Sequence, residues 1–283
     1  ELRYTNARLT AEAVRRLRLD PAQIQALSCG TSSPDQLMPG HGVMVHGELG
    51  AGACEVNSSA GICTAGVAAL KYAWMSVLSG NSDNAVATGS ELASTFMQAK
   101  NFEPESEARV SEMEGRPEIA FEKDFLRWML SDGAGAMLLQ ERPAAQGPSL
   151  RIDWLELHSY AHTQSACMYG GAEKNADGSL RGWREFDSME QLVKRSVLTV
   201  KQDVKQLNDN IVHTTVELAM PAIAAKHRLV PEAIDHFLPH MSSEYFRPRL
   251  AAGMERIGFA IPQEKWFTNL SQKGNTGSAS IYI

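Results

Sequence analysis

The segment NSSAGICTAGVAALKYA, residues Asn57 to Ala73, places a single cysteine among small residues just before a helical pattern. The apolar positions after the cysteine recur every three or four residues, which is the spacing of one helix face. They are Val67, Leu70, Trp74 and Leu78. Gly80 follows as a residue suited to a helix C-terminus. The segment therefore predicts Cys63 at the start of a helix, either as a packed core residue or as a nucleophile.

The sequence on both sides of this segment alternates between strand and helix patterns. Short apolar runs that end in turn residues predict strands, and apolar positions at helical spacing predict helices. The strands are expected at 23–33, 54–59 and 84–91, and the helices at 6–20 and 38–50. Residues 131–140, SDGAGAMLLQ, predict a glycine turn that leads into another strand. This alternation favours a mostly parallel sheet covered by helices.

The second half of the chain repeats the alternation after two polar stretches. Residues at about 97–128 have few core candidates and predict an insertion, and residues 142–149 predict a linker. Beyond them, strands are expected at 151–157, 235–240 and 265–270, and helices at about 189–207, 211–228 and 242–258. We therefore expect two α/β halves, 1–145 and 146–283, packed as one compact structural unit.

Composition limits the classes of protein that are plausible. The 283 residues are 43% hydrophobic and 21% charged, which is normal for a soluble globular protein. The formal net charge of −6 argues against nucleic acid as the main partner. No apolar run approaches the roughly 20 residues that span a bilayer, and no signal-peptide pattern is present. The chain starts at Glu1 and stops at SASIYI, so we expect that both ends are truncated.

The four cysteines are scattered and form no CxxC pair, which is typical of a reduced, cytoplasmic protein. His158, His162 and Cys167 lie close together in the sequence. No second ligand pair with zinc spacing accompanies them, so we expect no metal site.

Three residues stand where a predicted strand gives way to a predicted helix: Cys63, His240 and Asn275. The carboxyl ends of strands in α/β sheets are where ligand sites collect. The dipole and free N–H groups of a helix N-terminus favour a thiolate, and imidazole and carboxamide groups can stabilise a carbonyl oxygen that gains negative charge. Together they suggest acyl transfer. The alternatives are a core cysteine, a strand-end histidine and a turn asparagine, or a cysteine protease that uses the same residue types.

Six motifs in order resemble the β-ketoacyl-acyl-carrier-protein synthase III family of the thiolase superfamily. The resemblance covers nearly all of residues 5–283. The motifs are GTSSPDQLMPG, AGICTAGVAAL, AVATGSELAS, LSDGAGAMLL, FLPHMSS and GNTGSAS. No single motif is decisive, but the cysteine, histidine and asparagine motifs in that order, with DGAGA between them, are strong jointly.

The resemblance implies a thiolase-like duplicated α/β fold, in which two halves with five-stranded sheets pack as five layers, α-β-α-β-α. It also implies a homodimer that uses CoA or acyl-carrier-protein thioesters as substrates and has no bound cofactor. Cys63 would accept an acyl group, and its backbone N–H would form part of an oxyanion hole. His240 and Asn275 would hold the oxygen of a malonyl thioester during decarboxylation. Met38 matches a residue that borders the partner's acyl pocket.

The sequence also departs from the family pattern. The usual His-Gln-Ala-Asn reads His240-Met241-Ser242-Ser243, and the stretch between Val56 and Cys63 is lengthened. These differences suggest a specialised relative that makes lipid-like secondary metabolites, such as dialkylresorcinols or aryl polyenes. A same-fold acyltransferase to an oxygen or nitrogen nucleophile and a non-catalytic heterodimer subunit are the alternatives. Arg247 and Arg249 would meet an acidic carrier protein or a CoA phosphate, or form a solvated helix face.

Overall fold

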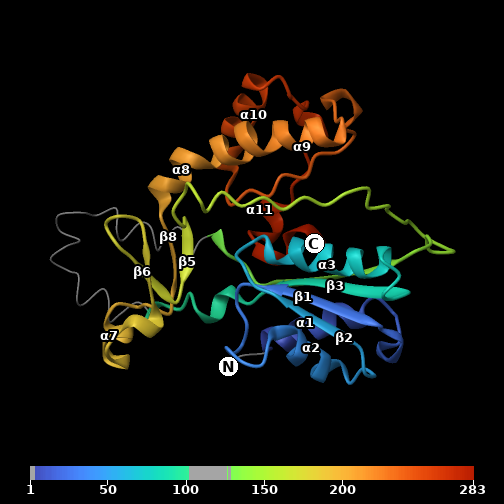
Figure 1. Cartoon of the computed structure of the whole chain (residues 1–283), viewed down its shortest axis with the longest axis horizontal. Coiled ribbons are helices and arrows are strands. Elements are labelled where there is room, and N and C mark those ends of the chain that lie inside the picture. Colours follow the sequence, from blue (N-terminus) through green and yellow to red (C-terminus); the bar gives the residue numbers. More distant parts are fainter. Residues whose placement is uncertain (1–3, 102–125, 127–128) are drawn as a thin grey trace. The chain divides into compact units, whose positions relative to one another are not determined.

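The computed structural model describes residues 4–101, 126 and 129–283, which form two compact units (Figure 1). The first unit comprises Glu1–Ala93, Ser131–Leu157 and Thr276–Ile283, and the second comprises Ser94–Leu130 and His158–Asn275. The division differs from the expected boundary at residue 145, because the last segment returns to the first unit. The predicted insertion at about 97–128 lies almost entirely outside the described residues.

The first unit is built on one four-stranded sheet. Its elements are α1 (Asn6–Arg15), β1 (Ala26–Thr31), α2 (His41–Leu49), β2 (Glu55–Ser59), α3 (Ala65–Leu78), β3 (Asn84–Glu91) and β4 (Gly133–Gln140). The strand order is β2-β1-β3-β4, with β1 parallel to β2 and to β3, and β4 antiparallel to β3. The prediction of a mostly parallel sheet covered by helices is confirmed for this unit.

The two faces of this sheet pack against two different buried clusters. Leu27, Cys29 and Val86 pack in one buried cluster with residues of α1 and α2. Their neighbours Ala26, Ala85 and Ala87 pack in a second cluster with residues of α3. Successive residues of a strand point to opposite faces, so helices on both sides form three layers (Figure 1).

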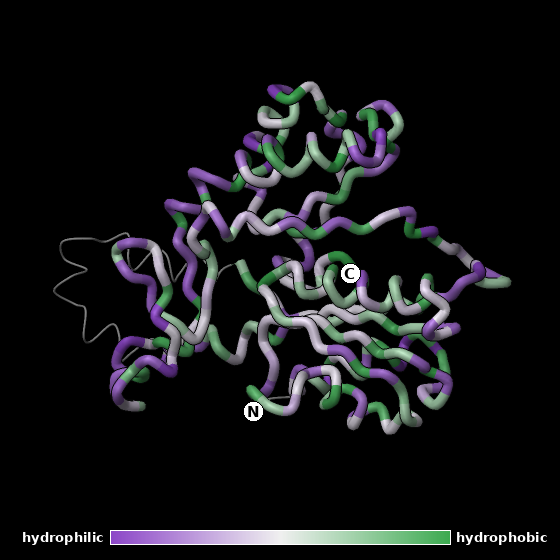
Figure 2. The backbone as a smooth tube through the Cα atoms, in the orientation of Figure 1, coloured by the Kyte–Doolittle hydropathy of each residue, from purple (hydrophilic) through white to green (hydrophobic). Residues whose placement is uncertain are grey.

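The helix after Cys63 forms as predicted, but it buries a different face. Hydrophobic residues recur along α3 (Figure 2), yet the residues that it buries are mostly small, and Leu78 is 69% exposed. The buried positions are Ala65, Gly66, Ala69, Leu70, Ala73 and Ser76. A Cβ atom on Gly30 of β1 would lie only 2.1 Å from the Ala65 carbonyl oxygen. Such a close helix–sheet approach requires small residues at the contact, which the apolar spacing did not reveal.

The segment 276–283 lies against α3, β3 and β4 at positions where the chain has glycine. A Cβ on Gly66 or Gly89 would lie 2.0 or 2.1 Å from the Ser278 carbonyl oxygen, and one on Gly135 would lie 2.3 Å from Cβ of Tyr282. The glycines of SDGAGA therefore do not form a turn. Gly133 and Gly135 lie inside β4, where they leave room for this segment.

The second unit contains shorter elements. They are β5 (Met168–Gly170), β6 (Ala172–Lys174), β7 (Leu180–Gly182), α7 (Met189–Lys194), β8 (Val200–Gln202), α8 (Val204–Val212), a π-helical stretch (His213–Ala219), α9 (Met220–His227), α10 (Arg247–Arg256) and α11 (Leu270–Lys273). β5 pairs with β8 and β6 with β7, both antiparallel. The main buried cluster consists of Val216, Met254, Ile261 and Trp266.

Several elements expected in the second half differ from the structure. The helix expected at 189–207 is divided into α7, β8 and α8, because Ser196 adopts a positive φ of 45° and the chain turns there. Among the described residues, the strands expected at 235–240 and 265–270 are reduced to one bridge between Phe237 and Trp266. A five-stranded sheet is therefore not found in either unit as described. The segment 151–157 packs Ile152 and Leu155, both partly buried, against a cluster of the first unit, but it is not assigned as a strand.

None of the helices in the described part of the chain combines the length and apolar character needed to cross a bilayer.

Candidate active site

Cys63 lies in the turn between β2 and α3, at the edge where the parallel strands end. The Ala65 N–H donates to the Gly61 carbonyl at 2.9 Å and closes this turn, in which Cys63 lies two residues before α3 begins. The thiol is free and the residue is half-buried. β1 and β3 end at the same edge, with Thr31 and Glu91. The expected position of Cys63, after a strand and before a helix, is therefore confirmed.

Glu91 forms a buried polar cluster at this edge that the sequence analysis missed. The residue is 4% exposed, and its Oε1 accepts hydrogen bonds from the hydroxyl groups of Ser32 at 2.5 Å and Ser278 at 2.6 Å. Its Oε2 accepts one from the hydroxyl of Ser33 at 2.7 Å. The backbone N–H groups of Ser32 and Ser278 also donate to Oε1. A signal was present, because an acidic residue ends a strand of otherwise small and apolar residues.

The Cys63 thiol is held in its neutral form. Loss of solvent raises the pKa of Cys63 to about 12, and repulsion by the Glu91 carboxylate acts in the same direction. A hydrogen bond from the backbone N–H of Cys63 itself opposes these effects without overcoming them. The expectation of a thiolate at the helix terminus is therefore not met, because desolvation and a nearby carboxylate favour the neutral thiol.

His240 follows a short parallel pairing in the second unit. The Phe237 N–H donates to the Lys265 carbonyl at 2.8 Å, and the Phe267 N–H donates to the Phe237 carbonyl at 2.9 Å. His240 lies three residues beyond Phe237 and is accessible to solvent. Surrounding protein atoms nevertheless desolvate the ring and lower the pKa of His240. The neutral imidazole is thereby favoured, and it can donate one N–H hydrogen bond.

Asn275 is fixed by backbone contacts in the same unit. Its N–H donates to the Met129 carbonyl at 3.0 Å, and it forms an isolated parallel bridge with Leu130. The residue is 3% exposed and follows Gly274, whose φ of +71° lets the chain change direction after α11. The structure thus places Cys63 in the first unit, and His240 and Asn275 in the second.

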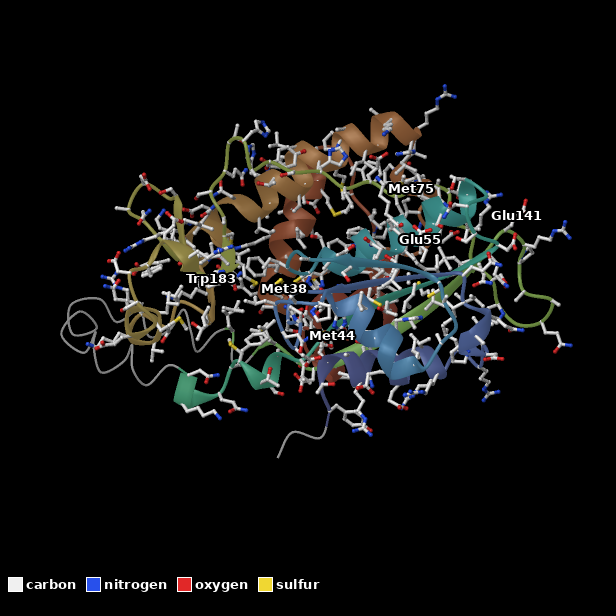
Figure 3. All side chains as sticks on the ribbon, turned by 60° about the horizontal axis from the view of Figure 1, so that its bottom comes forward. Met38, Met44, Glu55, Met75, Glu141 and Trp183 are labelled. Atoms are coloured by element: carbon white, nitrogen blue, oxygen red, sulfur yellow. The ribbon has the colours of Figure 1, made fainter. Side chains whose placement is uncertain are left out.

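The three weaker candidates lie on the surfaces of their units. Met38 is 83% exposed in the loop before α2 (Figure 3). Arg247 donates from Nε to Glu244 at 2.7 Å, and its guanidinium lies 5.6 Å from the Trp266 ring centroid. The Arg249 guanidinium lies 4.4 Å from the ring of Tyr245. Both arginines have local contacts that are consistent with an ordinary helix face.

The described residues include no group of three or more histidine, cysteine, aspartate or glutamate side chains that could hold a metal ion. In the sequence cluster named above, His162 stacks on Tyr160 with centroids 6.4 Å apart. Cys167 Sγ lies 3.6 Å from the carbonyl oxygen of Asp203.

Comparison with known proteins shows which proteins this chain resembles. Residues 48–145, which contain Cys63 and Glu91, match the model of the β-ketoacyl synthase N-terminal domain. The chain is 23% identical over 270 residues to the β-ketoacyl-acyl-carrier-protein synthase III of Methylococcus capsulatus, covering 95% of this chain and 69% of that protein. It is 26% identical over 263 residues to the enzyme of the same name from Limosilactobacillus reuteri, covering 93% and 68%.

Solved structures agree on the fold. OleA from Xanthomonas campestris superimposes with a TM-score of 0.64 at 20% identity, covering all of this chain and 72% of that one. AbyA1, described as a tetronic acid condensing enzyme, gives a TM-score of 0.66 at 17% identity, covering 100% and 73%. The thiolase-like α/β fold class is confirmed by these likenesses. The chain is therefore similar to β-ketoacyl-acyl-carrier-protein synthase III enzymes over most of its length, and residues 48–145 match the β-ketoacyl synthase N-terminal domain.

Proposed function

We propose that this chain is a decarboxylative condensing enzyme in which Cys63 is the acylated nucleophile. The observation that carries the proposal is the position of Cys63, a free thiol in the turn between a parallel strand and a 14-residue helix. The similarity to β-ketoacyl-acyl-carrier-protein synthase III enzymes supports the same chemistry. The tetronic acid condensing enzyme among the fold relatives supports a role in the synthesis of a lipid-like secondary metabolite.

In the first half-reaction, the Cys63 sulfur attacks the carbonyl carbon of an acyl thioester. A bond forms between sulfur and the acyl carbon, the thioester C–S bond of the donor breaks, and the proton of Cys63 leaves with the donor thiol. The backbone N–H of Cys63 would contribute to stabilising the oxyanion. Because the resting thiol is protonated, this proton must be removed during attack.

In the second half-reaction, a malonyl or related thioester loses CO2. The electron pair of the broken C–C bond passes to an enolate, whose carbon attacks the acyl group on Cys63. The C–S bond to Cys63 then breaks, and the released thiolate takes a proton from solvent. His240, neutral because of its lowered pKa, and Asn275 would donate hydrogen bonds to the enolate oxygen.

The reaction balances without a bound cofactor, since the CoA or acyl-carrier-protein thioesters are its substrates. We further propose that the chain acts as a homodimer in the reduced environment of the cytoplasm, with Met38 bordering the partner's acyl pocket. Arg247 and Arg249 are proposed contacts for a carrier protein or CoA phosphate. Their tests are charge-reversal variants, which should raise KM for the thioester without changing acylation by a short thioester analogue.

A mass measurement and a measurement of CO2 release test the function. Incubation of the protein with a panel of acyl-CoA thioesters should add the acyl mass, and the Cys63→Ala variant should add none. The acylated protein should then release 14CO2 from carboxyl-labelled malonyl thioester. His240→Ala and Asn275→Ala variants should still acylate but release little CO2.

The outcomes distinguish the alternatives left open by the sequence. Acylation without CO2 release, followed by transfer to an amine or alcohol, would identify an acyltransferase of the same fold. Absence of any acyl adduct across the panel would reject Cys63 as nucleophile and favour a non-catalytic subunit.

A further inference from the structure

The Glu91 carboxylate connects three segments of the first unit that are distant in sequence. Its hydrogen-bond donors come from the loop after β1, through Ser32 and Ser33, and from the asparagine motif GNTGSAS, through Ser278. Ser278 and Glu91 are separated by 187 residues in the chain. A single buried side chain thus holds together the carboxyl edge of the sheet.

Ser278 extends this network to the residue before the nucleophile. Its hydroxyl lies 2.6 Å from Glu91 Oε1 and 3.1 Å from the Ile62 carbonyl oxygen. The hydroxyl has one proton, and the shorter contact assigns it mainly to the carboxylate. The Ser278 N–H, 3.3 Å from the same oxygen, fixes the backbone as well. The position of Glu91 therefore determines what the turn carrying Cys63 packs against.

The contact between Gly277 and Glu91 requires a glycine. Gly277 has a φ of +54°, and a Cβ there would lie 2.6 Å from Cγ of Glu91. The chain before Ser278 consequently lies directly on the aliphatic part of the glutamate. Glycine satisfies both the backbone conformation and the contact.

Asp35 is a second carboxylate of this unit, and its role is structural. Asp35 accepts hydrogen bonds from the backbone N–H groups of Asn6 at 2.7 Å and Ala7 at 2.8 Å, at the start of α1. Those contacts anchor a helix terminus. Glu91 differs because its negative charge also acts on the Cys63 thiol. Its hydrogen bonds come from hydroxyl and backbone amide groups.

We propose that Glu91 is a positioning residue for Cys63, which fixes Ser278 beside the Ile62 carbonyl and places a negative charge near the thiol. The inference rests on the proposed role of Cys63 as nucleophile. The arrangement keeps the Cys63 thiol protonated, so that it reacts slowly with adventitious electrophiles.

Alkylation by iodoacetamide tests the inference without any acyl substrate. The rate at Cys63 is followed by peptide mass spectrometry from pH 7 to 10 in the wild type and in Glu91→Gln, Ser278→Ala and Glu141→Gln variants. Glu141 is an exposed carboxylate of the same unit (Figure 3) and serves as the matched control. Labelling of Cys29, which is fully buried, reports whether each variant stays folded.

We expect Glu91→Gln to alkylate about three- to tenfold faster at pH 8, with a lower apparent pKa. Each unit of lowering raises the thiolate fraction tenfold, while the nucleophilicity of the thiolate declines in part. Ser278→Ala keeps the charge but removes the hydroxyl beside Ile62. It should change the alkylation rate of Cys63 by the same factor at every pH from 7 to 10. Glu141→Gln should alkylate at the wild-type rate.

An unchanged pH profile in folded Glu91→Gln would overturn the proposal. Should Glu91→Gln expose Cys29 by unfolding, Ser278→Ala decides alone, and a wild-type rate in that variant would reject the positioning role. Because alkylation needs no acyl donor, a protein that fails to acylate would disprove the proposed function and leave this measurement intact.

Discussion

Replacement of Gly89 by alanine should destabilise the first unit through a single methyl group. The new Cβ would lie 2.1 Å from the Ser278 carbonyl oxygen, about 1.3 Å short of ordinary contact at 3.4 Å, and 2.8 Å from two ring carbons of Tyr282. Gly89 is in the middle of the pairing between β3 and β4, so neither backbone can retreat easily. Overpacking of this kind costs about 2 kcal/mol.

The assay is the rate at which Cys29 reacts with a thiol reagent under native conditions. Cys29 is fully buried on β1, so it reacts only when the unit opens. When reclosing is faster than labelling, the rate follows the open population, and 2 kcal/mol corresponds to about a 30-fold increase. Gly47→Ala is the matched control, since a Cβ at Gly47 of α2 meets nothing within 4 Å and alanine favours a helix. Equal Cys29 rates in the two variants would refute the close approach of the 276–283 segment.

Three further results are expected. Burial lowers the pKa of His41 from 6.5 to about 4, against the opposing effect of Asp35. Because the unfolded chain binds this proton more tightly, the free energy of unfolding of the first unit, measured in urea, should be about 2 kcal/mol lower at pH 5 than at pH 7.5. His41→Gln should remove this dependence of stability on pH. Met254→Ala should cost about 2–5 kcal/mol, seen as early unfolding of the second unit, because Met254 is fully buried there, whereas an unshifted transition would contradict that burial. Ser243→Ala should cost about 1 kcal/mol, because the Ser243 hydroxyl accepts from the Tyr245 N–H before α10, and Ser243→Asp should restore most of the loss.

The sequence patterns were most informative in the first unit. There, apolar runs bounded by turn residues located β1, β2 and β3 closely, and Gly50 and Gly80 were expected helix ends, both with positive φ in the structure. Local patterns suffice where each strand finds partners in the same sheet.

The patterns failed where distant contacts decide the outcome. The buried face of α3 depends on how closely the helix approaches β1, and the glycines of β4 serve a segment more than 130 residues away. The local spacing of apolar residues indicates neither the approach of α3 to β1 nor the contact of β4 with residues 276–283.

The candidate site shows the same limit. The sequence indicated that Cys63, His240 and Asn275 lie at element boundaries, which agrees with the turns and bridges found there. It did not indicate that burial, reinforced by Glu91, would keep the thiol protonated, because both effects arise only when folding brings these groups together.

The glycine-lined contact with residues 276–283 also sets an order of events during synthesis. Translation runs from the N-terminus, so β1, β2, α3 and β3 emerge long before Ser278 and Tyr282 exist. Until those residues leave the ribosome, the glycine positions of α3, β3 and β4 face water, and the Glu91 carboxylate lacks two of its donors. The first unit therefore begins to emerge before the second unit and is completed only after it, and chaperones can bind its incomplete surface in that interval.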